Sequence, residues 1–403
     1  MMPVKNSTTL GNDAVFLRMA LELAQHGLGW TSPNPLVGCV LARDGSVIGR
    51  GFHPRDGANH AEHEALLNAG GEARGATAYT TLEPCSVESR TPSCCKLLSA
   101  AGVVRVVYGA LDSDARSGGR STEVLARQGI CAGPPQGAGS AEVIRACEQL
   151  LDYYSHAQRR QQPFVHLKLA LSLDGKLACA NGASQWLSGP QSLGLAHYLR
   201  QKYDAILVGY RTALHDDPRL TARPDALRNY FELHSPARNP LRVVLDPRWE
   251  TLPSLAAGSA EPALKLTDFS GNWRAHLPHL VIAGRDDYPR PQHGLPDAAQ
   301  LLPLAPAADG QLEYAALLSA LWQLGVRSLL VEGGAGVAQS LLAQRAVNKL
   351  SAVFTPRLLG GDALGFSPAL GLDHVGGGMR LEDVRTEVLG DDVLLSGYPV
   401  WPD

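Results

Sequence analysis

Residues 60–95 read HAEHEALLNAGGEARGATAYTTLEPCSVESRTPSCC, and this stretch decides the fold that we expect around it. The segment 60–69 has a helical pattern and ends at a pair of glycines, which supply the backbone freedom of a helix end. A β-prone run at 76–82 follows, and an early proline marks a second helix over 92–101. A strand between two helices predicts an α/β layer domain.

The flanking segments continue the alternation of strands and helices. Asp44-Gly45 separates two β-prone runs and is a strong signal for a hairpin. We therefore expect a mostly parallel sheet covered by helices on both faces. The further elements expected here are a helix at 13–25 and strands at 37–42, 47–52 and 103–111.

A second α/β series follows the first. One helix is expected over 141–162, and it becomes polar before Pro163, as a connection between domains does. Two segments rich in Pro, Asp and Ala, 223–240 and 285–306, are expected to be surface loops without regular structure. The expected strands lie at 164–173, 205–209, 242–246, 279–284 and 328–331 and near 352 and 393. The predicted divisions are a flexible leader at 1–12, a first domain at 13–147, a connecting helix at 148–162 and a second domain at 163–403.

The composition excludes several classes of protein. The chain has 403 residues, of which 45% are hydrophobic and 19% charged, which is ordinary for globular domains and excludes disordered, collagen-like and disulfide-scaffold proteins. A formal net charge of -3 supplies no bulk positive field, so we expect no nucleic-acid partner and no membrane partner. No stretch approaches the ~20 apolar residues of a membrane span, and residues 1–13 lack the features of a signal peptide. We therefore expect a cytoplasmic protein, and the sequence leaves a homo-oligomer open.

The chain has seven cysteines, an odd number, which favours reduced thiols with metal-binding or catalytic roles over a disulfide framework. His60 and Glu62 stand at one expected helix start, whereas Cys85 precedes the next expected helix and Cys94 lies at its beginning. One imidazole and two thiolates can hold Zn²⁺ and leave a fourth position for water. H-x-E followed by P-C-x-x-C is the pattern of zinc-dependent nucleobase deaminases, although here eight residues separate the cysteines.

Other ligand sets remain open at this point. Cys95 is an alternative third ligand, whereas His53 and His63 are less favoured. A structural zinc site is the main competing interpretation of the cluster. A nucleic-acid deaminase or RNA-binding protein is a further alternative, disfavoured by the acidic balance of the chain.

Gly333, Gly334 and Gly336 follow the expected strand at 328–331. Glycines at a strand-to-helix turn allow close approach of the backbone to a ligand, and the free N–H groups of a helix start attract phosphate. A tight turn without a ligand is the alternative.

The first domain resembles the deaminase domain of the bifunctional deaminase/reductase family of riboflavin biosynthesis. The matching segments are TSPNPLVGCV at 31–40, HAE at 60–62, LEPCS at 82–86 and RTP at 90–92, with the cysteines at 94 and 95. The resemblance implies a cytidine-deaminase fold, a Zn²⁺ bound by His60, Cys85 and Cys94, and Glu62 as the proton shuttle. It also implies contacts with the pyrimidine substrate from Asn34, His53, Arg90 and Asp112.

The second domain resembles the reductase of the same family, which has the dihydrofolate-reductase fold and uses NADPH. The matching segments are LK at 167–168, SLDGK at 172–176, SQWLS at 184–188, DP at 217–218, LT at 220–221 and VEGG at 331–334. The residues implied to bind the ribosylamino substrate and its phosphate are Lys168, Arg200, Asp216, Leu220, Arg223 and Glu332. The residues implied to lie near NADPH are Trp186, Ser188, Thr212, Gly333 and Gly334.

Several positions depart from the pattern of this family. Glu64 replaces a histidine, and Val87 and Ser89 replace a histidine and a glycine. The D-P-N segment of the family appears as Asp112-Ser113-Asp114, and its following A-G-x-G segment as Ser117-Gly118-Gly119-Arg120. All these changes spare the zinc ligands. The leading hypothesis is deamination of a pyrimidine ribosyl phosphate, followed by NADPH-dependent reduction of its ribosyl side chain. The alternative is a reductase whose deaminase domain is inactive or acts on another substrate.

Overall fold

A computed structural model of the protein describes residues 13–88, 92–183, 187–255, 263–273, 277–290, 294–307 and 311–402. The chain divides into two compact units, Met1–Gln161 and Gln162–Asp403. The predicted leader at 1–12 lies outside the described residues. None of the described helices combines the length and the apolar character needed to cross a membrane.

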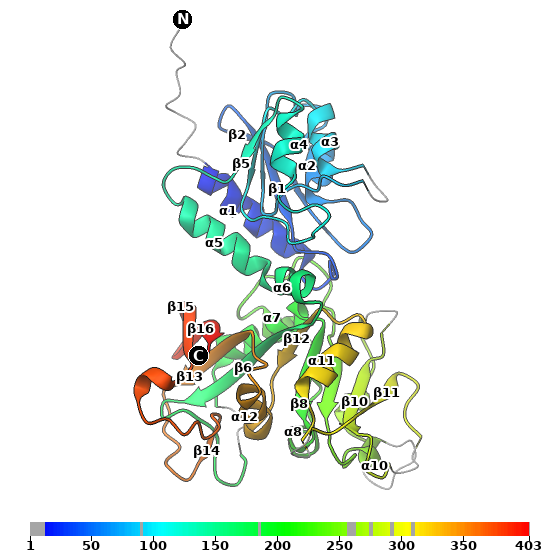
Figure 1. Ribbon diagram of the computed structural model, residues 1–403, viewed down its shortest axis with the longest axis vertical. Coiled ribbons are helices and arrows are strands. Elements are labelled where there is room, and N and C mark those ends of the chain that lie inside the picture. Colours follow the sequence, from blue (N-terminus) through cyan, green and yellow to red (C-terminus); the bar gives the residue numbers. More distant parts are fainter. Residues whose placement is uncertain are drawn as a thin grey trace, which may run out of the picture. The chain divides into compact units, whose positions relative to one another are not determined.

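In the first unit a sheet lies between two layers of helices (Figure 1). Its strand order in the described part of the chain is β2-β1-β3-β4-β5. Helices α1 and α5 pack together on one face, whereas α2, α3 and α4 follow one another on the other. The strands are β1 (Gly38–Arg43), β2 (Ser46–Phe52), β3 (Thr77–Thr80), β4 (Arg105–Tyr108) and β5 (Cys131–Gly133). The helices are α1 (Asp13–Ala24), α2 (Ala61–Asn68), α3 (Cys94–Ala100), α4 (Ser121–Ala126), α5 (Ser140–Leu150) and α6 (Asp152–Arg160), with a short 3₁₀ helix at Gln25–Gly27.

The predicted hairpin is confirmed, but the expectation of a mostly parallel sheet in this unit is wrong. Asp44 and Gly45 adopt φ of 54° and 79°, the left-handed conformation of a two-residue hairpin turn. This turn makes β1 and β2 antiparallel, and β1 also pairs with β3 antiparallel. Only the β3–β4 and β4–β5 pairs are parallel, so the sheet is mixed.

The single helix expected at 141–162 is instead two helices, α5 and α6, that meet at Leu151. The Asp152 side chain accepts a hydrogen bond of 2.7 Å from the N–H of Tyr153. An aspartate that binds a neighbouring backbone N–H competes with a continuous helix and favours a new helix start. The helical sequence pattern of the segment therefore did not reveal that the helix is interrupted at Leu151.

In the second unit a larger sheet has the order β11-β10-β9-β8-β12-β6-β13-β16-β15 within the described residues. It is parallel from β11 to β13, and β16 and β15 add antiparallel strands at one edge. Strands β7 (Lys176–Ala178) and β14 (Leu364–Gly365) form a separate antiparallel pair. The strands of the larger sheet are β6 (Phe164–Ser172), β8 (Ala205–Gly209), β9 (Leu241–Leu245), β10 (Leu280–Arg285), β11 (Ala299–Leu304), β12 (Ser328–Val331), β13 (Lys349–Thr355), β15 (Arg380–Leu389) and β16 (Asp392–Val400). The helices are α7 (Pro190–Lys202), α8 (Tyr210–Asp216), α9 (Pro224–Leu227), α10 (Leu252–Leu255), α11 (Tyr314–Gln323) and α12 (Ala335–Ala343), with 3₁₀ helices at Lys265–Thr267 and Val375–Gly377.

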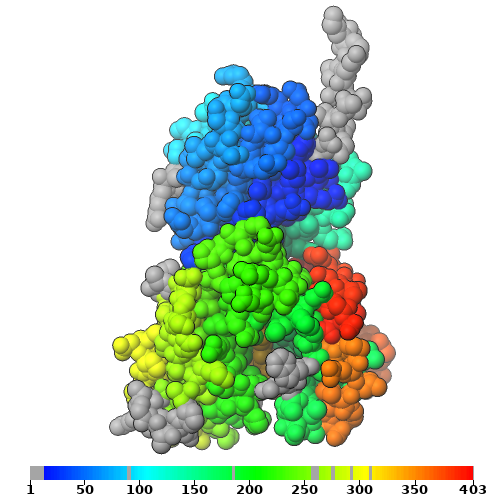
Figure 2. All heavy atoms as spheres, turned by 180° about the vertical axis from the view of Figure 1, so that it is seen from behind, coloured from blue at the N-terminus to red at the C-terminus, as the bar shows by residue number. Residues whose placement is uncertain are grey.

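Helices cover both faces of this sheet, whose central strands are buried on both faces. Val165 and Leu167 of β6 belong to a buried cluster that also includes residues of α11 and α12. On the opposite face, His166 hydrogen-bonds at 2.8 Å to Tyr203, which directly follows α7. Figure 2 shows the segment containing α7 and α9 in green on the surface of this unit. The carboxyl ends of β6, β8 and β12 lie in neighbouring strands, the usual position of ligand sites in α/β sheets.

Two segments expected to lack regular structure contain short elements. The segment 223–240 includes α9, which begins at Pro224, a residue that suits the first position of a helix. The segment 285–306 includes β11, whose sequence AQLLPL contains Pro303. Because β11 is an edge strand, the missing N–H of that proline costs no hydrogen bond to a further strand. The proline-rich composition therefore concealed an edge strand.

The close packing of α2 on β2 generates a prediction about Gly51. A Cβ at this position would lie 2.3 Å from the carbonyl oxygen of Ala61 and from the amide nitrogen of Ala65. We expect Gly51→Ala to displace α2 and to destabilise the first unit by about 1–3 kcal/mol. Gly133→Ala is the control, because a Cβ there would meet no atom within 4 Å. Hydrogen–deuterium exchange should accelerate in α2 of the first variant only; equal protection in both would contradict the prediction.

Candidate active sites

Three metal-binding side chains of the first unit lie together where two helices begin. His60 directly precedes α2, Cys94 is the first residue of α3, and Cys85 lies in the loop before α3. Their ligand atoms all lie within 4.8 Å of one another, with His60 Nδ1 3.3 Å from Cys94 Sγ and 3.6 Å from Cys85 Sγ. Tetrahedral zinc with Zn–N of ~2.0 Å and Zn–S of ~2.3 Å separates such ligands by about 3.6 Å. The donor set therefore fits zinc.

The protonation of Cys85 also suits a metal ligand. The backbone N–H of Cys94 donates to Cys85 Sγ at 3.2 Å. Hydrogen bonding from Cys94, followed by that from His60, lowers the pKa of the Cys85 thiol to about 4. Cys85 is therefore a thiolate at neutral pH, the form that binds metals. All seven cysteines are free thiols, as the sequence predicted.

The geometry separates the alternative ligands. Cys95 Sγ is directed to the carbonyl oxygen of Pro84 at 3.7 Å, whereas the adjacent Cys94 faces His60. Among the described residues, the group that could hold a metal consists of His60, Cys85 and Cys94 and leaves out Cys95, His53 and His63.

Glu62 lies in the first turn of α2, one residue after the start of the helix, and is 3% exposed. Burial raises the pKa of its carboxyl group, whereas the charge of His60 opposes that rise. The carboxyl group does not belong to the set of clustered ligand atoms. Glu62 is thus a buried acid beside the cluster that can take up and release a proton.

His53 contributes a buried nitrogen beside the metal ligands. Its ring centre lies 5.7 Å from that of His60, and its Nδ1 is 2.9 Å from the carbonyl oxygen of Asn59. That contact places the proton on Nδ1, because a carbonyl oxygen can only accept. His53 Nε2 is buried and has no hydrogen-bond partner among the described residues. The Asn59 side chain in turn donates to Glu64 Oε1 at 2.9 Å.

Of the other residues that the sequence predicts to contact the pyrimidine, one lies beside the metal ligands, one binds a neighbouring loop and one is not described. Asp112 has an electrostatic interaction with His60, accepts a hydrogen bond from the Tyr154 hydroxyl at 3.0 Å, and has a pKa raised by burial. Asn34 donates from Nδ2 to Asp56 Oδ1 at 2.9 Å. Arg90 lies outside the described residues.

Sequence reasoning assigned no role to Glu83, although it directly precedes Pro84 and Cys85. Glu83 is 2% exposed and accepts hydrogen bonds from the backbone N–H groups of Asp112, Gly119 and Ser121 and from the Ser121 hydroxyl. These contacts hold the loop after β4 against the strand that leads to Cys85. The only signal in the sequence was an acidic residue beside a candidate metal ligand.

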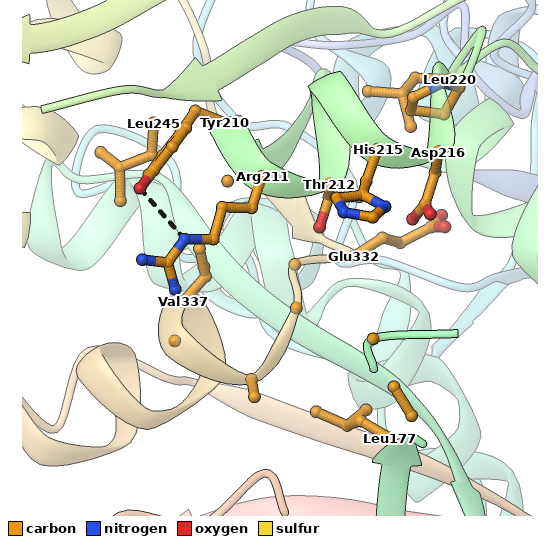
Figure 3. Close-up of a pocket in the computed structure, with 18 of the residues that line it drawn as sticks. Leu177, Tyr210, Arg211, Thr212, His215, Asp216, Leu220, Leu245, Glu332 and Val337 are labelled. Carbon is orange, nitrogen blue, oxygen red and sulfur yellow. Dashed lines mark hydrogen bonds between the residues drawn. The ribbon is translucent and has the colours of Figure 1, made fainter. Parts of the chain in front are cut away.

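The second unit contains a cleft of about 1780 Å³ at the carboxyl ends of its central strands. Figure 3 shows Thr212 and Asp216 projecting from α8 toward this cleft. Burial raises the pKa of Asp216. Leu220 is 3% exposed and has a φ of 52°, a left-handed conformation that is uncommon for leucine and typical of functional sites. The predicted residues that line the cleft are Lys168, Ser188, Arg200, Thr212, Asp216, Leu220, Arg223, Glu332, Gly333 and Gly334, whereas Trp186 lies outside the described residues.

A buried ion pair crosses one wall of the cleft. Arg200 of α7 binds Glu332, which follows β12, through two hydrogen bonds of 2.9 and 2.7 Å, and both side chains are 13% exposed. Despite the opposing effect of burial, the charge of Arg200 holds the pKa of Glu332 below its usual value. Lys168 of β6 lies near the same pair, and burial lowers its pKa. The cleft thus brings two basic side chains and one carboxylate together at this point.

The glycine turn after β12 fits a ligand that approaches the backbone closely. A Cβ at Gly333 would lie 2.6 Å from Val337 Cβ, and one at Gly334 would lie 3.3 Å from Thr212 Oγ1. Any larger side chain would fill the space between α8 and the start of α12. The backbone N–H groups at the start of α12 can donate hydrogen bonds to phosphate oxygens. This part of the cleft therefore suits the diphosphate of a dinucleotide.

His197 is a second residue that sequence reasoning missed. It lies three positions before Arg200 in α7, so the two share a helix face. Its ring contacts Arg223 and the carbonyl oxygen of Thr221. The spacing from Arg200 was the signal that could have found it.

The chain matches known families over both units. Residues 11–110 match the family described as "Cytidine and deoxycytidylate deaminase zinc-binding region", and residues 163–395 match "RibD C-terminal domain". The chain is 35% identical to riboflavin biosynthesis protein RibD of Escherichia coli, over 95% of this chain and 98% of that protein. It is 33% identical to RibD of Haemophilus influenzae, over 96% of this chain and 97% of the relative.

Solved structures agree with these matches. RibD of Acinetobacter baumannii superposes with a TM-score of 0.75 and 30% identity, covering 97% of this chain and 99% of the other. A Thermotoga maritima protein described as a diaminohydroxyphosphoribosylaminopyrimidine deaminase/5-amino-6-(5-phosphoribosylamino)uracil reductase superposes with a TM-score of 0.76 and 29% identity, covering 96% and 99%. The fold is therefore a cytidine-deaminase-like unit followed by a reductase unit. The chain belongs to the RibD family, and it is a bifunctional riboflavin-biosynthesis enzyme with a zinc-dependent deaminase and an NADPH-dependent reductase.

Proposed function

We propose that the first unit removes the C2 amino group of 2,5-diamino-6-(5-phosphoribosylamino)pyrimidin-4(3H)-one and that the second unit then reduces the ribosyl group of the product to a ribityl group. The observation that most directly supports this proposal is the cluster of His60, Cys85 and Cys94 beside the buried acid Glu62. Relatives of the RibD family act on a small pyrimidine ribosyl phosphate. The free thiols and the use of NADPH also favour a cytoplasmic location.

In the deaminase site, His60, Cys85 and Cys94 would hold the zinc ion, which supplies an acidified water at neutral pH. Glu62 accepts a proton on its carboxylate and returns it to the amino group that leaves. Its raised pKa suits both steps, because the carboxyl group can hold the proton between them. His53 accepts a hydrogen bond from the pyrimidine at its partnerless Nε2. Asp112 lies beside the cluster and forms part of the wall that receives the ring.

Two further residues, Asn34 and Arg90, are proposed as substrate contacts on the resemblance alone. Asn34 lies in the loop before β1 and is bound to Asp56, which follows β2. The contact joins two loops of the deaminase unit. The role of Arg90 likewise stays a prediction.

In the reductase site, bound NADPH would supply a hydride to C1′ of the ribosyl group in its ring-opened, imine-like form, while the imine nitrogen takes up a proton. Thr212, Gly333 and Gly334, together with Ser188 and Trp186, are proposed to hold the cofactor. The Arg200–Glu332 pair and Lys168 orient the ribosylamino part of the substrate, and Arg223 binds its phosphate. Asp216 and Leu220 complete the substrate wall of the cleft.

The contacts of Glu64 support a role that the departure from the family pattern did not suggest. Glu64 holds the Asn59 side chain, and the Asn59 carbonyl oxygen accepts the proton of His53 Nδ1. Glu64 therefore helps to keep His53 Nε2 as an acceptor. Val87 is exposed, Ser89 lies outside the described residues, and Asp114 binds Arg116 through two carboxylate oxygens. An inactive deaminase unit is not favoured, because the metal ligands and Glu62 are intact.

The adjacent thiols supply a test of the metal site. We expect Cys94→Ser to lose most of its zinc, whereas Cys95→Ser, whose thiol faces Pro84, retains about one zinc per chain. Inductively coupled plasma mass spectrometry of the purified variants measures this. Equal zinc content in the two variants would show that the cluster is not the metal site.

Glu62→Gln tests the proton relay and the separation of the two activities. We expect ammonia release from the diamino substrate to fall about 10²–10⁴-fold, because the amide cannot shuttle a proton. Zinc content and NADPH oxidation with the deaminated product should stay within about twofold of the unmodified protein. Ammonia release that persists at the original rate would exclude Glu62 as the shuttle, and parallel loss of both activities would indicate misfolding.

Glu64 offers a matched pair of variants. Glu64→Ala removes the acceptor for Asn59, and we expect KM for the deaminase substrate to rise about 3–10-fold, the value of one hydrogen bond. Glu64→Gln keeps an oxygen at the same place and should stay within about twofold. Steady-state ammonia release measures both. If the two variants behave alike, the contact with Asn59 is not what Glu64 contributes.

A further inference from the structure

The contacts of His197 link a buried residue of α7 to the exposed cation Arg223. His197 is fully buried, and its Nε2 lies 3.3 Å from Arg223 Nε. Its Nδ1 lies 3.0 Å from the carbonyl oxygen of Thr221 and 3.1 Å from the backbone nitrogen of Arg223. One imidazole therefore touches both the side chain and the backbone of this arginine.

The contact with the Arg223 side chain indicates one tautomer of His197. Arg223 Nε can only donate a hydrogen bond, so His197 Nε2 accepts it. In a neutral ring the proton then resides on Nδ1, which faces the carbonyl oxygen of Thr221. The backbone N–H of Arg223 also points to Nδ1, so the assignment rests on the Nε contact. Burial, followed by the charges of Arg200 and Arg223, lowers the pKa of His197 to about 3, so the ring stays neutral at physiological pH.

The hydrogen bond leaves the outer face of the Arg223 guanidinium available. Among the described residues, no acceptor binds its terminal nitrogens. Arg200, by contrast, is neutralised by Glu332 through two hydrogen bonds. Arg223 is thus a cation at the edge of the cleft that is held at Nε and lacks a described anionic partner. A guanidinium in this state suits a phosphate group, which accepts two parallel N–H bonds.

We propose that His197 is a positioning residue of the reductase site, which fixes the Arg223 guanidinium so that its terminal N–H groups face the phosphate of the substrate. This inference rests on the proposed function of the cleft. Without the His197 acceptor, the long side chain of Arg223 would sample several rotamers and would lose orientation before binding. The backbone is already fixed, because Pro224 restricts the residue before it to an extended conformation. His197 supplies the corresponding restraint on the side chain.

Two substitutions separate the two ends of the imidazole. His197→Asn places an amide near the Nδ1 position and can keep the hydrogen bond to Thr221, but it lacks an acceptor for Arg223 Nε. His197→Gln reaches the Nε2 position with its Oε1 and can restore that acceptor. NADPH oxidation is measured with the deaminated pyrimidine ribosyl phosphate and with the same compound without its phosphate. Thermal unfolding of each variant confirms that it is folded.

For His197→Asn we expect KM for the phosphorylated substrate to rise about 5–20-fold and kcat to stay within about twofold. The lost contact stabilises the bound substrate and the transition state equally, so only the affinity should fall. KM for the dephosphorylated compound should not change, and His197→Gln should recover most of the affinity. In an Arg223→Lys background, which removes Nε, His197→Asn should have no further effect on KM.

Several results would overturn the inference. Equal rises in KM for both compounds, or an undiminished effect in the Arg223→Lys background, would assign His197 a merely structural role. An unchanged KM in both His197 variants would remove the role altogether. If the unmodified protein does not oxidise NADPH with the phosphorylated substrate, it is the proposed function that fails. If it does so and KM does not respond to His197, only the positioning role fails.

Discussion

The reductase cleft depends on the buried ion pair between Arg200 and Glu332. A buried guanidinium that loses its carboxylate costs several kcal/mol, so this pair ties α7 to the end of β12. Glu332 binds Arg200 through both of its oxygens, whereas Arg223 has no anionic partner among the described residues. Arg223 is thus one of the cationic side chains of the cleft that the ion pair leaves without an anion, and the neutral ring of His197 contacts it without competing for its charge.

The buried carboxylate of Glu83 in the deaminase unit is stabilised without a cationic partner, unlike that of Glu332. Glu83 receives four hydrogen bonds from N–H and hydroxyl groups of the loop after β4, without a cation. The carboxylate therefore organises a loop close to Cys85 and adds no positive charge that would compete with a metal ion. Glu62 is buried beside His60 with fewer donors, and its pKa is raised. The two glutamates thus differ in their surroundings: Glu83 is bound by four donors of one loop, whereas burial raises the pKa of Glu62, which suits the proton exchange that we propose for it.

Features that depend on residues close together in the chain could be predicted from the sequence. The Asp44-Gly45 turn specified a hairpin, and the spacing of His60, Cys85 and Cys94 relative to helix starts indicated the group that the structure brings together. The mixed sheet was not predictable in the same way, because apolar strands do not reveal their partners. Exposed edges such as β11 were also missed, since a strand with one neighbour tolerates proline and polar residues.

The residues that sequence reasoning missed share a physical property: their partners are distant in the chain or act through the backbone. Glu83 binds backbone N–H groups 29 to 38 positions away, and a backbone donor leaves no residue type to recognise. Glu64 shows the converse. In the family pattern a histidine stands at this position. Glu64 nevertheless binds the Asn59 side chain, and the Asn59 carbonyl oxygen faces His53 Nδ1 and so favours the tautomer with its proton there. A motif compares residue types at one position, whereas the chemistry depends on which donors and acceptors meet. A departure from a motif therefore weakens a functional assignment only when the contact it made has no replacement.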